Sequence, residues 1–549
     1  MEPTVASPAL EETRTAIKTH SKMIKTNRLY FGDNLDFLRN QDKFPSESVD
    51  LIYLDPPFNS AQSYNILFKE VEGTPSTAQI KAFKDTWSWD DASAKVLYDL
   101  NSPKSKAPTA LVQLMNVLEQ FLHHSPMFAY LLMMSVRLVE LHRILKPTGS
   151  LFLHCDPTAS HYLKLVLDGV FGPRLCRNEI VWHYRRWTAS SKRLQRMHDI
   201  ILFYTKHQDN TINQTYVMPT AGQLRKHEKG WDRNTVPIDG IRRPQLIVYD
   251  QTKVDQAVAE GRLDLSEFAR IITPKSSLTT APDVWQIDYI NSQSRERLGY
   301  PTQKPLDLLL RIVRITSNPG DIVLDPFCGC GTTIDAVETL NQENPNDPPR
   351  RWLGIDITHL AIDLIKSRLA TRFGITRKDY SVIGEPTTLD EARALRDENR
   401  YQFQYWALGL IGARPWGEEK KGKDRGIDGY RSHLHGPERS FKRCIVQVKS
   451  GKVQPSMVRD LKGTMEREKA EMAAFVTLEP ATKEMRGEAS ATGFYRSEVM
   501  NRDYPRLQIL TIEELLHNPD VFKIPPGGEY QPARKFLPKP KKQEGIFDG

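Results

Sequence analysis

Apolar runs and helical patterns alternate along the chain from about residue 26 to residue 385. Residues 49–55 (VDLIYLD) form an apolar run between turn residues, which predicts a buried strand. Residues 128–149 show a helical pattern that stops at Pro147 and Gly149, which predicts a helix. Because strands that alternate with helices usually form a parallel sheet covered by helices, we predict an α/β fold for this part of the chain.

This alternation is interrupted once and then gives way to a second pattern. Between residues 186 and 294, aromatic, basic and amide residues mix without a regular period, which indicates an inserted module. Beyond residue 386, a helical pattern leads to the strand-like run 443–449, another helix and another strand, so we predict a separate α/β domain. Thr511 and Glu514 have the spacing of a capping box for a last short helix. The predicted parts are a tail (1–25), two halves of the first sheet (26–185 and 295–385), the insert (186–294), the second domain (386–525) and a basic tail (526–549).

The composition is that of a globular protein, with 39% hydrophobic and 26% charged residues in a chain of 549. The most apolar segment, 127–145, contains Arg137, Glu140 and Arg143 and is too polar to cross a membrane. The N-terminus lacks the apolar core of a signal peptide, and five cysteines do not make a disulfide framework. We therefore expect a cytoplasmic protein without membrane contact. Its formal net charge of +8 suits a polyanionic partner.

A glycine-containing turn follows the strand-like run 321–327 (DIVLDPF). Gly329 and Gly331 lack a Cβ, so a ligand can approach the backbone of this turn close to the N-terminus of the next helix. Asp325 stands at the mouth of the turn, where it is placed to face the cationic end of a sulfonium cofactor. Asp356 ends the next predicted strand, where an acidic residue commonly binds ribose hydroxyls. A nicotinamide cofactor is the alternative, but the turn lacks the third glycine of GxGxxG.

A second motif, Asp55-Pro56-Pro57-Phe58, follows the predicted strand 49–55. Reactive groups collect at the carboxyl ends of the strands of an open parallel sheet, so this tetrapeptide and the glycine turn can share one edge. A carboxylate and a proline carbonyl that accept both N–H bonds of an exocyclic amine aim the nitrogen lone pair at a methyl donor. The aromatic ring can stack on a base swung out of a duplex. A rigid turn without chemistry is the alternative interpretation of the motif.

The two motifs together resemble those of the amino-DNA methyltransferases, which use S-adenosylmethionine, and their order along the chain is that of the β class. Two further segments are similar: 28–38 (RLYFGDNLDFL), whose Asp33 would contact the cofactor's adenine, and 300–305 (YPTQKP), which would line its methionine end. One departure is Cys330, where the family more commonly has serine. The resemblance implies a Rossmann-like methyltransferase sheet, with the target-recognition region at 186–294. The cofactor-binding residues that we assign are Asp33, Asp55, Thr302, Lys304, Asp325, Phe327, Gly329, Gly331, Thr332 and Asp356.

The expected substrate is a base in double-stranded DNA, flipped into the site. Within this family an aspartate at the start of the tetrapeptide favours the N6 amine of adenine, with the N4 amine of cytosine as the alternative. Location at the nucleoid follows from such a substrate, and the resemblance also allows a homodimer, which no residue requires. A solvated basic face is the other interpretation of the residues that we assign to DNA contact, which are Arg185, Arg186, Lys192, Arg193 and Arg196.

The predicted C-terminal domain carries a third motif. Asp428 lies on a glycine-flanked turn, and Gln447 and Lys449, two residues apart, share one face of a strand. A phosphodiesterase needs an acidic metal ligand and a lysine beside the attacking water or the phosphate. The pattern resembles restriction-endonuclease-like nucleases of the Mrr type, a PD-(D/E)xK-like fold. The resemblance implies that Asp428 and Gln447 bind Mg²⁺ and that Lys449 is the catalytic lysine.

Several functions therefore stay open at the level of the sequence. The chain is either a single-chain restriction-modification protein or a methyltransferase whose C-terminal domain only binds DNA or a partner. A DNA-binding protein with a decayed methyltransferase fold is a further alternative, which the intact motifs argue against. A methyltransferase of RNA or protein is another, and the basic insert and the nuclease-like domain favour DNA over it.

Overall fold

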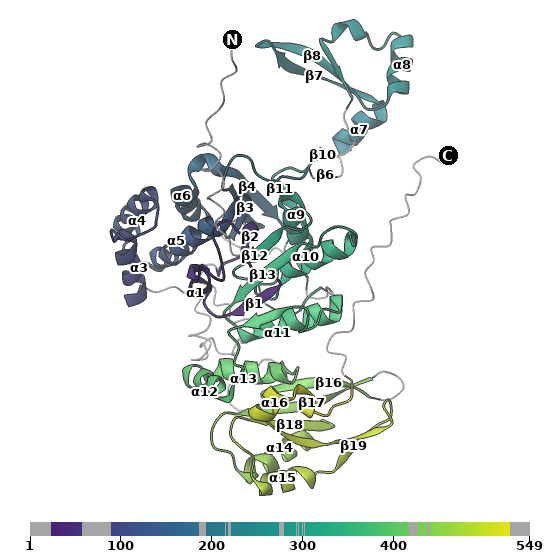
Figure 1. The fold of residues 1–549 in the computed structure, drawn as a ribbon. Coiled ribbons are helices and arrows are strands. Elements are labelled where there is room, and N and C mark those ends of the chain that lie inside the picture. The colour runs from purple at the N-terminus through teal and green to yellow at the C-terminus, as the bar shows by residue number, and fades with distance from the viewer. Residues whose placement is uncertain are drawn as a thin grey trace, which may run out of the picture. The chain divides into compact units, whose positions relative to one another are not determined.

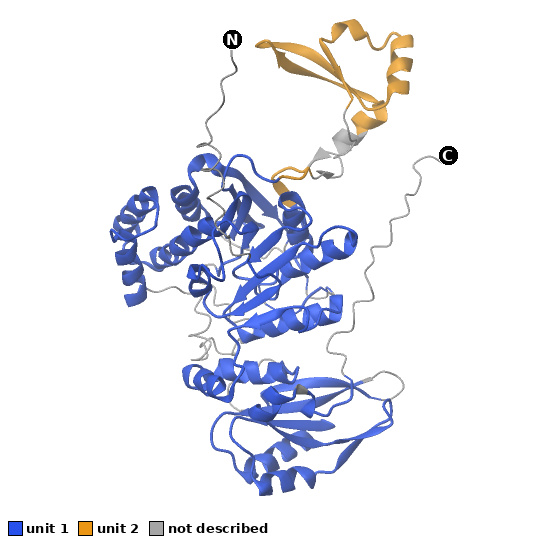
Figure 2. Ribbon diagram, viewed as in Figure 1, with its two compact units in different colours: residues 1–211, 286–549 blue, residues 212–285 orange. Residues whose placement is uncertain are grey.

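The computed structural model describes residues 24–57, 89–185, 194–214, 216–217, 221–273, 279–291, 294, 296–298, 300, 302–416, 426–435 and 440–526. These residues form two compact units (Figure 2), one of which is residues 212–285 and the other the remainder. No helix of the described residues is long and apolar enough to cross a membrane.

The larger unit contains a nine-stranded sheet (Figure 1). Its strands, in spatial order, are β11 (Val284–Gln286), β4 (Cys176–His183), β5 (His198–Thr205), β3 (Leu145–Cys155), β2 (Val49–Leu54), β12 (Ile322–Asp325), β13 (Arg351–Asp356), β1 (Arg28–Phe31) and β14 (Ser381–Ile383). The strands from β3 to β14 run parallel, whereas β5 pairs antiparallel with both β3 and β4. The predicted α/β fold with a Rossmann-like sheet is confirmed.

Helices pack on both faces of this sheet (Figure 1), because the strands are apolar on both sides. All six residues of β2 are buried, as expected for a central strand of a parallel sheet. Helix α5 begins at Pro126, capped by Ser125, two residues before the predicted start, and ends at Ile144, so that the predicted stop residues Pro147 and Gly149 lie in β3. The helices around the sheet are α1 (Asn34–Arg39), α3 (Asp91–Asn101), α4 (Thr109–Leu122), α5 (Pro126–Ile144), α6 (Ser160–Phe171), α9 (Leu306–Thr316), α10 (Thr332–Glu343) and α11 (His359–Arg368).

The smaller unit, residues 212–285, lies within the predicted insert 186–294. The predicted insert is wider than this unit because β5, which lies near the start of the insert, belongs to the nine-stranded sheet. A small core gathers around Trp231 and Leu246. The elements of this unit are β6 (Tyr216–Val217), α7 (Ala221–Lys229), β7 (Trp231–Ile238), β8 (Ile241–Val248), α8 (Gln251–Ala259), β9 (Arg270–Ile272), β10 (Thr279–Thr280) and the first residues of β11.

The C-terminal part of the larger unit has a five-stranded sheet of its own, with one apolar core on each face. The predicted capping box is present, because Thr511 and Glu514 each accept from the other's backbone N–H. The sheet strands are β15 (Arg414–Pro415), β16 (Gly429–His435), β17 (Ser440–Lys449), β18 (Met472–Thr477) and β21 (Leu507–Thr511), beside the hairpin β19 (Phe494–Ser497) and β20 (Arg502–Pro505). The helices are α12 (Leu389–Glu398), α13 (Arg400–Leu410), α14 (Pro455–Arg467), α15 (Lys483–Ser490) and α16 (Ile512–His517).

Candidate active site at the carboxyl edge of the main sheet

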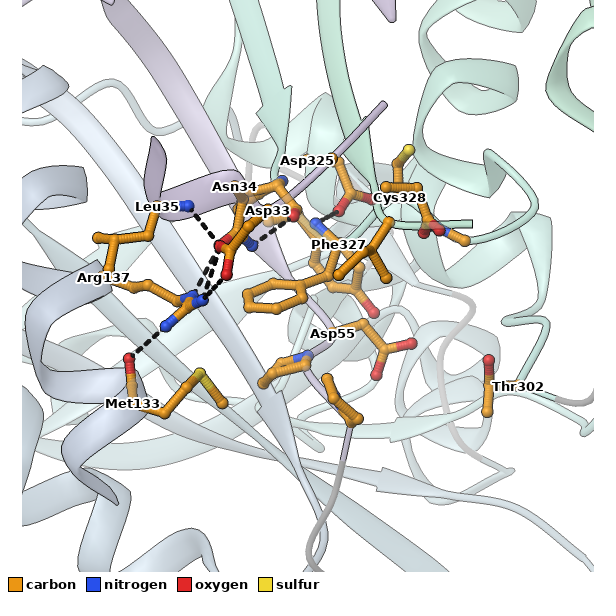
Figure 3. Close-up of a pocket in the computed structure, with 18 of the residues that line it drawn as sticks. Asp33, Asn34, Leu35, Asp55, Met133, Arg137, Thr302, Asp325, Phe327 and Cys328 are labelled. Atoms are coloured by element: carbon orange, nitrogen blue, oxygen red, sulfur yellow. Dashed lines mark hydrogen bonds and ion pairs between the residues drawn. The ribbon is translucent and has the colours of Figure 1, made fainter. Parts of the chain in front are cut away.

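Four acidic residues meet where neighbouring parallel strands end. Asp55 follows β2, Asp325 and Asp356 end β12 and β13, and Asp33 follows β1. The register explains their proximity, because Leu324 pairs with Ile52 and Phe31 pairs with Asp356. All four carboxylates line one cavity of about 540 Å³, and Figure 3 shows Asp33, Asp55 and Asp325 around it. The two sequence motifs therefore share one site.

The glycine turn adopts the backbone conformation that its sequence predicts. Gly331 has φ 77° and caps the N-terminus of α10, and Gly329 has φ 48°. Both values lie in the left-handed region that favours glycine. A Cβ on Gly331 would lie 2.6 Å from Cγ1 of Ile365, and a Cβ on Gly329 would lie 3.2 Å from the Tyr300 ring. The turn is therefore closely packed behind the cavity that it lines.

The two buried carboxylates at this turn have perturbed acidities. Burial raises the pKa of Asp325 to about 7, although the Thr333 hydroxyl and the Phe327 amide, both of which donate to it, act in the opposite direction. Burial likewise raises the pKa of Asp356 to about 6, against the amides of Gly329 and Thr358. A cationic ligand stabilises the charged form of a carboxylate whose ionisation is disfavoured by burial. The cavity therefore suits a molecule with a positive charge.

Asp33 is held by a buried arginine that the sequence did not single out. The Asp33 carboxylate caps α1 by accepting from the Leu35 amide at 2.8 Å, and Arg137 Nη2 donates to both its oxygens at 2.7 and 3.0 Å. Arg137 Nε also donates to Asn34 Oδ1, and Asn34 donates to the Pro326 carbonyl at 2.7 Å. This chain of bonds (Figure 3) joins α1, α5 and the glycine turn into one wall of the cavity.

Asp55 forms an ion pair with Lys304, and the Asp55 side chain is 14% exposed. Lys304 Nζ also donates to the Thr302 carbonyl at 3.4 Å. Pro56 and Pro57 line the cavity beside Asp55, whereas Phe58 lies outside the described residues. Because Lys304 stabilises the negative charge, Asp55 can accept a hydrogen bond from a polar ligand in the cavity.

The remaining assigned residues divide between the cavity and the surface. Thr302, Phe327 and Thr332 line the cavity with the other assigned cofactor residues except Gly331, which lies between the lining residues Cys330 and Thr332. Arg185 is exposed, and Arg196 donates to Asp156 at 3.2 Å, one residue beyond the end of β3. The other three residues assigned to DNA contact, Arg186, Lys192 and Arg193, lie outside the described residues.

Behind Asp55 lies a further group of residues that sequence reasoning missed: Tyr53, His154 and Asp199. Tyr53 and His154 precede the ends of β2 and β3, and a histidine followed by an acid in SLFLHCD was the available signal. Asp199 comes from β5, whose antiparallel pairing with β3 has no signature in the local sequence.

In the C-terminal domain the three predicted residues lie on β17 and the turn before β16. Asp428 Oδ2 accepts from the Val448 amide at 2.7 Å, and Asp428 Oδ1 accepts from the Gln404 side chain at 3.1 Å. Gln447 Nε2 donates to the Gly426 carbonyl, while the buried Gln447 Oε1 has no hydrogen-bond partner. Lys449 is half-buried at the end of the same strand.

This donor set does not fit Mg²⁺ well. It offers one carboxylate and one amide oxygen, and both carboxylate oxygens already accept hydrogen bonds. Magnesium sites generally depend on carboxylates with water or phosphate oxygens. Within the part of the chain that the structure describes, no group of three His, Cys, Asp or Glu side chains could hold a metal ion. The predicted Mg²⁺ site is therefore not supported.

Comparison with known proteins gives related sequences for most of the chain. The chain is 29% identical over 273 residues to the type II methyltransferase M.EcaI of Enterobacter cloacae, covering 44% of this chain and 58% of that protein. It is 23% identical over 378 residues to the Mod subunit of the type III restriction-modification enzyme StyLTI of Salmonella typhimurium, covering 62% and 53%. It is 24% identical over 336 residues to the DNA adenine methyltransferase YhdJ of Escherichia coli, covering 61% and 80%. The chain thus spans just over half the length of the first two relatives.

Two family models match separate parts of the chain. Residues 402–517 match a family described as NACHT-associated inactive Restriction Endonuclease 1. The C-terminal domain is therefore similar to a family of inactive restriction endonucleases, and its Mrr-type identity stays a prediction. Residues 49–367, more than half of the chain, match the N6/N4 family described as DNA methylase. This match includes Asp55, the glycine turn and Asp356, so the chain belongs to the DNA methylase family.

Proposed function

We propose that the protein transfers a methyl group from S-adenosylmethionine to the exocyclic N6 amine of adenine in double-stranded DNA, as an enzyme of the β class. The observation that carries the proposal is that Asp55, Pro56 and Pro57 line the same cavity as the glycine turn. An amine acceptor site and a methyl-donor site must adjoin for direct transfer, because the reacting atoms have to come within about 3–3.5 Å of each other.

The cavity residues fit the cofactor. The positive-φ glycines leave room at the backbone, Asp33 and Asp356 stand where adenine and ribose are expected, and Asp325 can balance a cationic end. When bound, S-adenosylmethionine supplies the methyl group and accepts the bonding electron pair on its sulfur. Thr302 and Lys304 would line its methionine end. Phe327, Gly329 and Thr332 form the wall against which it would lie, and Gly331 shapes the turn between the lining residues Cys330 and Thr332.

Asp55 has the central role on the acceptor side. Its carboxylate and the Pro56 carbonyl accept the two N–H bonds of the amine, which holds the nitrogen lone pair toward the donor. Lys304 forms an ion pair with this carboxylate and so holds it in place beside the cavity. Phe58, next in the chain, is the proposed stacking partner of the flipped base. Adenine is favoured over cytosine by the aspartate of the tetrapeptide and by the similarity to an adenine methyltransferase.

For target recognition we infer that the smaller unit, together with the basic segment 185–196, contacts DNA. The support is the hairpin of β7 and β8, which extends beyond β9 in their three-stranded sheet and there has exposed residues on both strands, 233–235 and 237 on β7 and 241–244 on β8. Arg242 and Arg243 lie on this exposed part, next to the tip at Asp239 and Gly240. A two-stranded ribbon is narrow enough to enter the major groove, and arginine reads guanine or binds phosphate there.

For the C-terminal domain we propose binding of DNA or a partner without Mg²⁺-dependent cleavage. The unsuitable donor set around Asp428 and the family description support this alternative over a nuclease. A single-chain restriction-modification protein remains the competing proposal. It predicts Mg²⁺-dependent cleavage of unmethylated plasmid that is lost in Lys449→Ala, whereas the favoured proposal predicts no cleavage by the parent protein.

The decisive experiment is mass spectrometry of nucleosides from unmethylated plasmid incubated with protein and S-adenosylmethionine. The control is Asp55→Asn, which keeps the size of the side chain but removes its charge. N6-methyladenine from the parent alone would support the base, the reaction and the role of Asp55. N4-methylcytosine would overturn the choice of base, and no methylated base would overturn the function.

A further inference from the structure

A buried histidine stands directly behind Asp55, between two carboxylates. His154 is fully buried, with Nδ1 3.9 Å from Asp55 Oδ1 and Nε2 3.4 Å from Asp199 Oδ2. The Tyr53 hydroxyl lies 3.0 Å from His154 Nδ1, and the Tyr184 hydroxyl donates to Asp199 Oδ1 at 3.1 Å. The proposed methyl transfer, as described so far, uses none of these four residues.

The strand pairing produces this arrangement. Leu54 pairs with Leu153 between β2 and β3, so the next residues along the two parallel strands, Asp55 and His154, are neighbours. On the other side, β5 runs antiparallel to β3, with His154 opposite Ile201, and brings Asp199 to the far edge of the imidazole. Trp182 of β4 packs edge-on against the ring at 5.5 Å. The imidazole is therefore fixed in orientation rather than free to rotate.

The bonding pattern is consistent with one tautomer of the neutral ring. Asp199 can only accept, so Nε2 carries the hydrogen, and Nδ1 is then the acceptor for the Tyr53 hydroxyl. Although burial raises the pKa of Asp199, the bonds from His154 and Tyr184 and the charge of Lys304 lower it overall, so this carboxylate is charged at neutral pH. A charged Asp199 on one side and Asp55 on the other would stabilise an imidazolium between them.

The proposed function creates a need for such a group. Methylation of an amine forms the N–C bond and leaves one proton to be removed from the nitrogen. Asp55 is the nearest base, but its carboxylate is the proposed acceptor for the amine and the partner of Lys304, so it must lose the proton again before the next amine can bind. A second acceptor behind Asp55 would take the proton onward and restore the carboxylate for the next substrate.

We propose that His154, oriented by Asp199, is a positioning residue that receives the proton of the methylated amine from Asp55. This inference rests on the proposed function. The proton moves from the nitrogen to Asp55 Oδ1, and then to His154 Nδ1, either directly after a small approach or through the Tyr53 hydroxyl. His154 becomes an imidazolium paired with the Asp199 carboxylate and holds the proton at Nδ1 until the product has left, after which Nδ1 releases it and the starting tautomer is restored. No bond other than N–H and O–H bonds changes in this relay.

The test compares His154→Gln with the parent in single-turnover methylation, so that product release does not hide the chemical step. Glutamine can still hydrogen-bond to Asp199 but cannot take up a proton at neutral pH. We expect a rate about 100-fold lower, the low end of the usual range for proton-transfer groups, with unchanged Kd values for S-adenosylmethionine and DNA. His142→Gln, a half-buried histidine outside this group, is the matched control and should leave the rate unchanged.

The pH profile separates proton acceptance from a purely structural role. The parent rate should rise with pH as the acceptor loses its proton, and this inflection should disappear in His154→Gln. The ionisable groups that surround the imidazole and must be considered with it are Tyr53, Asp55, Tyr184, Asp199 and Lys304.

Each outcome decides the proposal. If the parent methylates DNA and His154→Gln does so at the same rate within twofold, the relay is overturned and the proposed function is left intact. A parent that does not methylate would overturn both. If His154→Gln fails to fold by circular dichroism, Asp199→Asn takes its place, because it keeps the size of the side chain and removes the charge that supports the imidazolium. An unchanged rate and pH profile in that variant would equally overturn the relay.

Discussion

Replacement of Gly331 by alanine tests whether the glycine turn is limited by its backbone conformation alone or also by its packing. The left-handed φ of 77° costs an L-residue about 1–2 kcal/mol. The new Cβ would also lie 2.6 Å from Cγ1 of Ile365 on α11, and such overpacking typically costs about 1–3 kcal/mol more. We therefore expect Gly331→Ala to lower the free energy of unfolding by about 2–5 kcal/mol in total.

The chain offers a matched control for the conformational part. Gly374 has φ 72°, almost the same value, but a Cβ there would meet no atom within 4 Å. Gly374→Ala should therefore cost only the about 1–2 kcal/mol of the left-handed conformation. In thermal unfolding, each kcal/mol of destabilisation lowers the Tm by about 2–4 °C for a domain of 150–250 residues, so the two variants should differ in Tm. Cofactor affinity should fall in Gly331→Ala and stay unchanged in Gly374→Ala, since Gly331 lies between two residues that line the cavity, Cys330 and Thr332, whereas no neighbour of Gly374 in the chain lines it.

A double-mutant cycle with Ile365→Ala completes the design. Removal of the Ile365 side chain takes away the atoms that the new Cβ would overlap, so the added cost of Gly331→Ala in that background should fall to that of Gly374→Ala. Equal destabilisation by Gly331→Ala and Gly374→Ala in the parent background would refute the packing part of the reasoning.

Three further predictions follow from the electrostatics and the exposed ribbon. Affinity for S-adenosylmethionine, measured by calorimetry, should rise as the pH increases through about 7, because Asp325 then becomes charged, and Asp325→Asn should remove this dependence. The double change Arg242→Ser and Arg243→Ser should weaken DNA binding and reduce the slope of log K against log salt by about 2 if both bind phosphate; an unchanged slope would place the DNA contact elsewhere. Lys449→Ala should leave plasmid integrity in Mg²⁺ unchanged, because no cleavage is expected from the parent; nicking by the parent alone would contradict this.

The sequence was most informative where one strand and the turn after it determine the geometry. Asp55 and Asp325 each follow an apolar run, and the rule that parallel strands end at one edge was sufficient to predict their shared site. The glycines of the turn were predictable for the same reason, because their positive φ is a local property of the backbone. The α/β fold followed from the alternation of apolar runs.

The residues that sequence reasoning missed depend on contacts between distant segments. Arg137 reaches Asp33 from the middle of α5, and its position in an apolar helix indicated only that the helix does not cross a membrane. Asp199 meets His154 because β5 reverses direction beside β3, and apolar periodicity does not give strand order. In the C-terminal domain, Gln447 and Lys449 lie on one strand as their spacing predicted. The Gln404 amide that donates to Asp428 comes from α13, and no sequence motif pointed to this contact.

The position at which the smaller unit is inserted has a consequence for how such proteins diversify. The chain leaves the main sheet after β5 and returns at β11, and only β4 lies between these two strands. A segment that departs and returns at nearly the same place can be exchanged by recombination without changing the order of the strands. Asp55 and Asp325 belong to strands outside this junction. Under the proposal that the smaller unit contacts the target DNA, one contiguous exchange of gene sequence would change the target and leave the residues of the cavity unchanged.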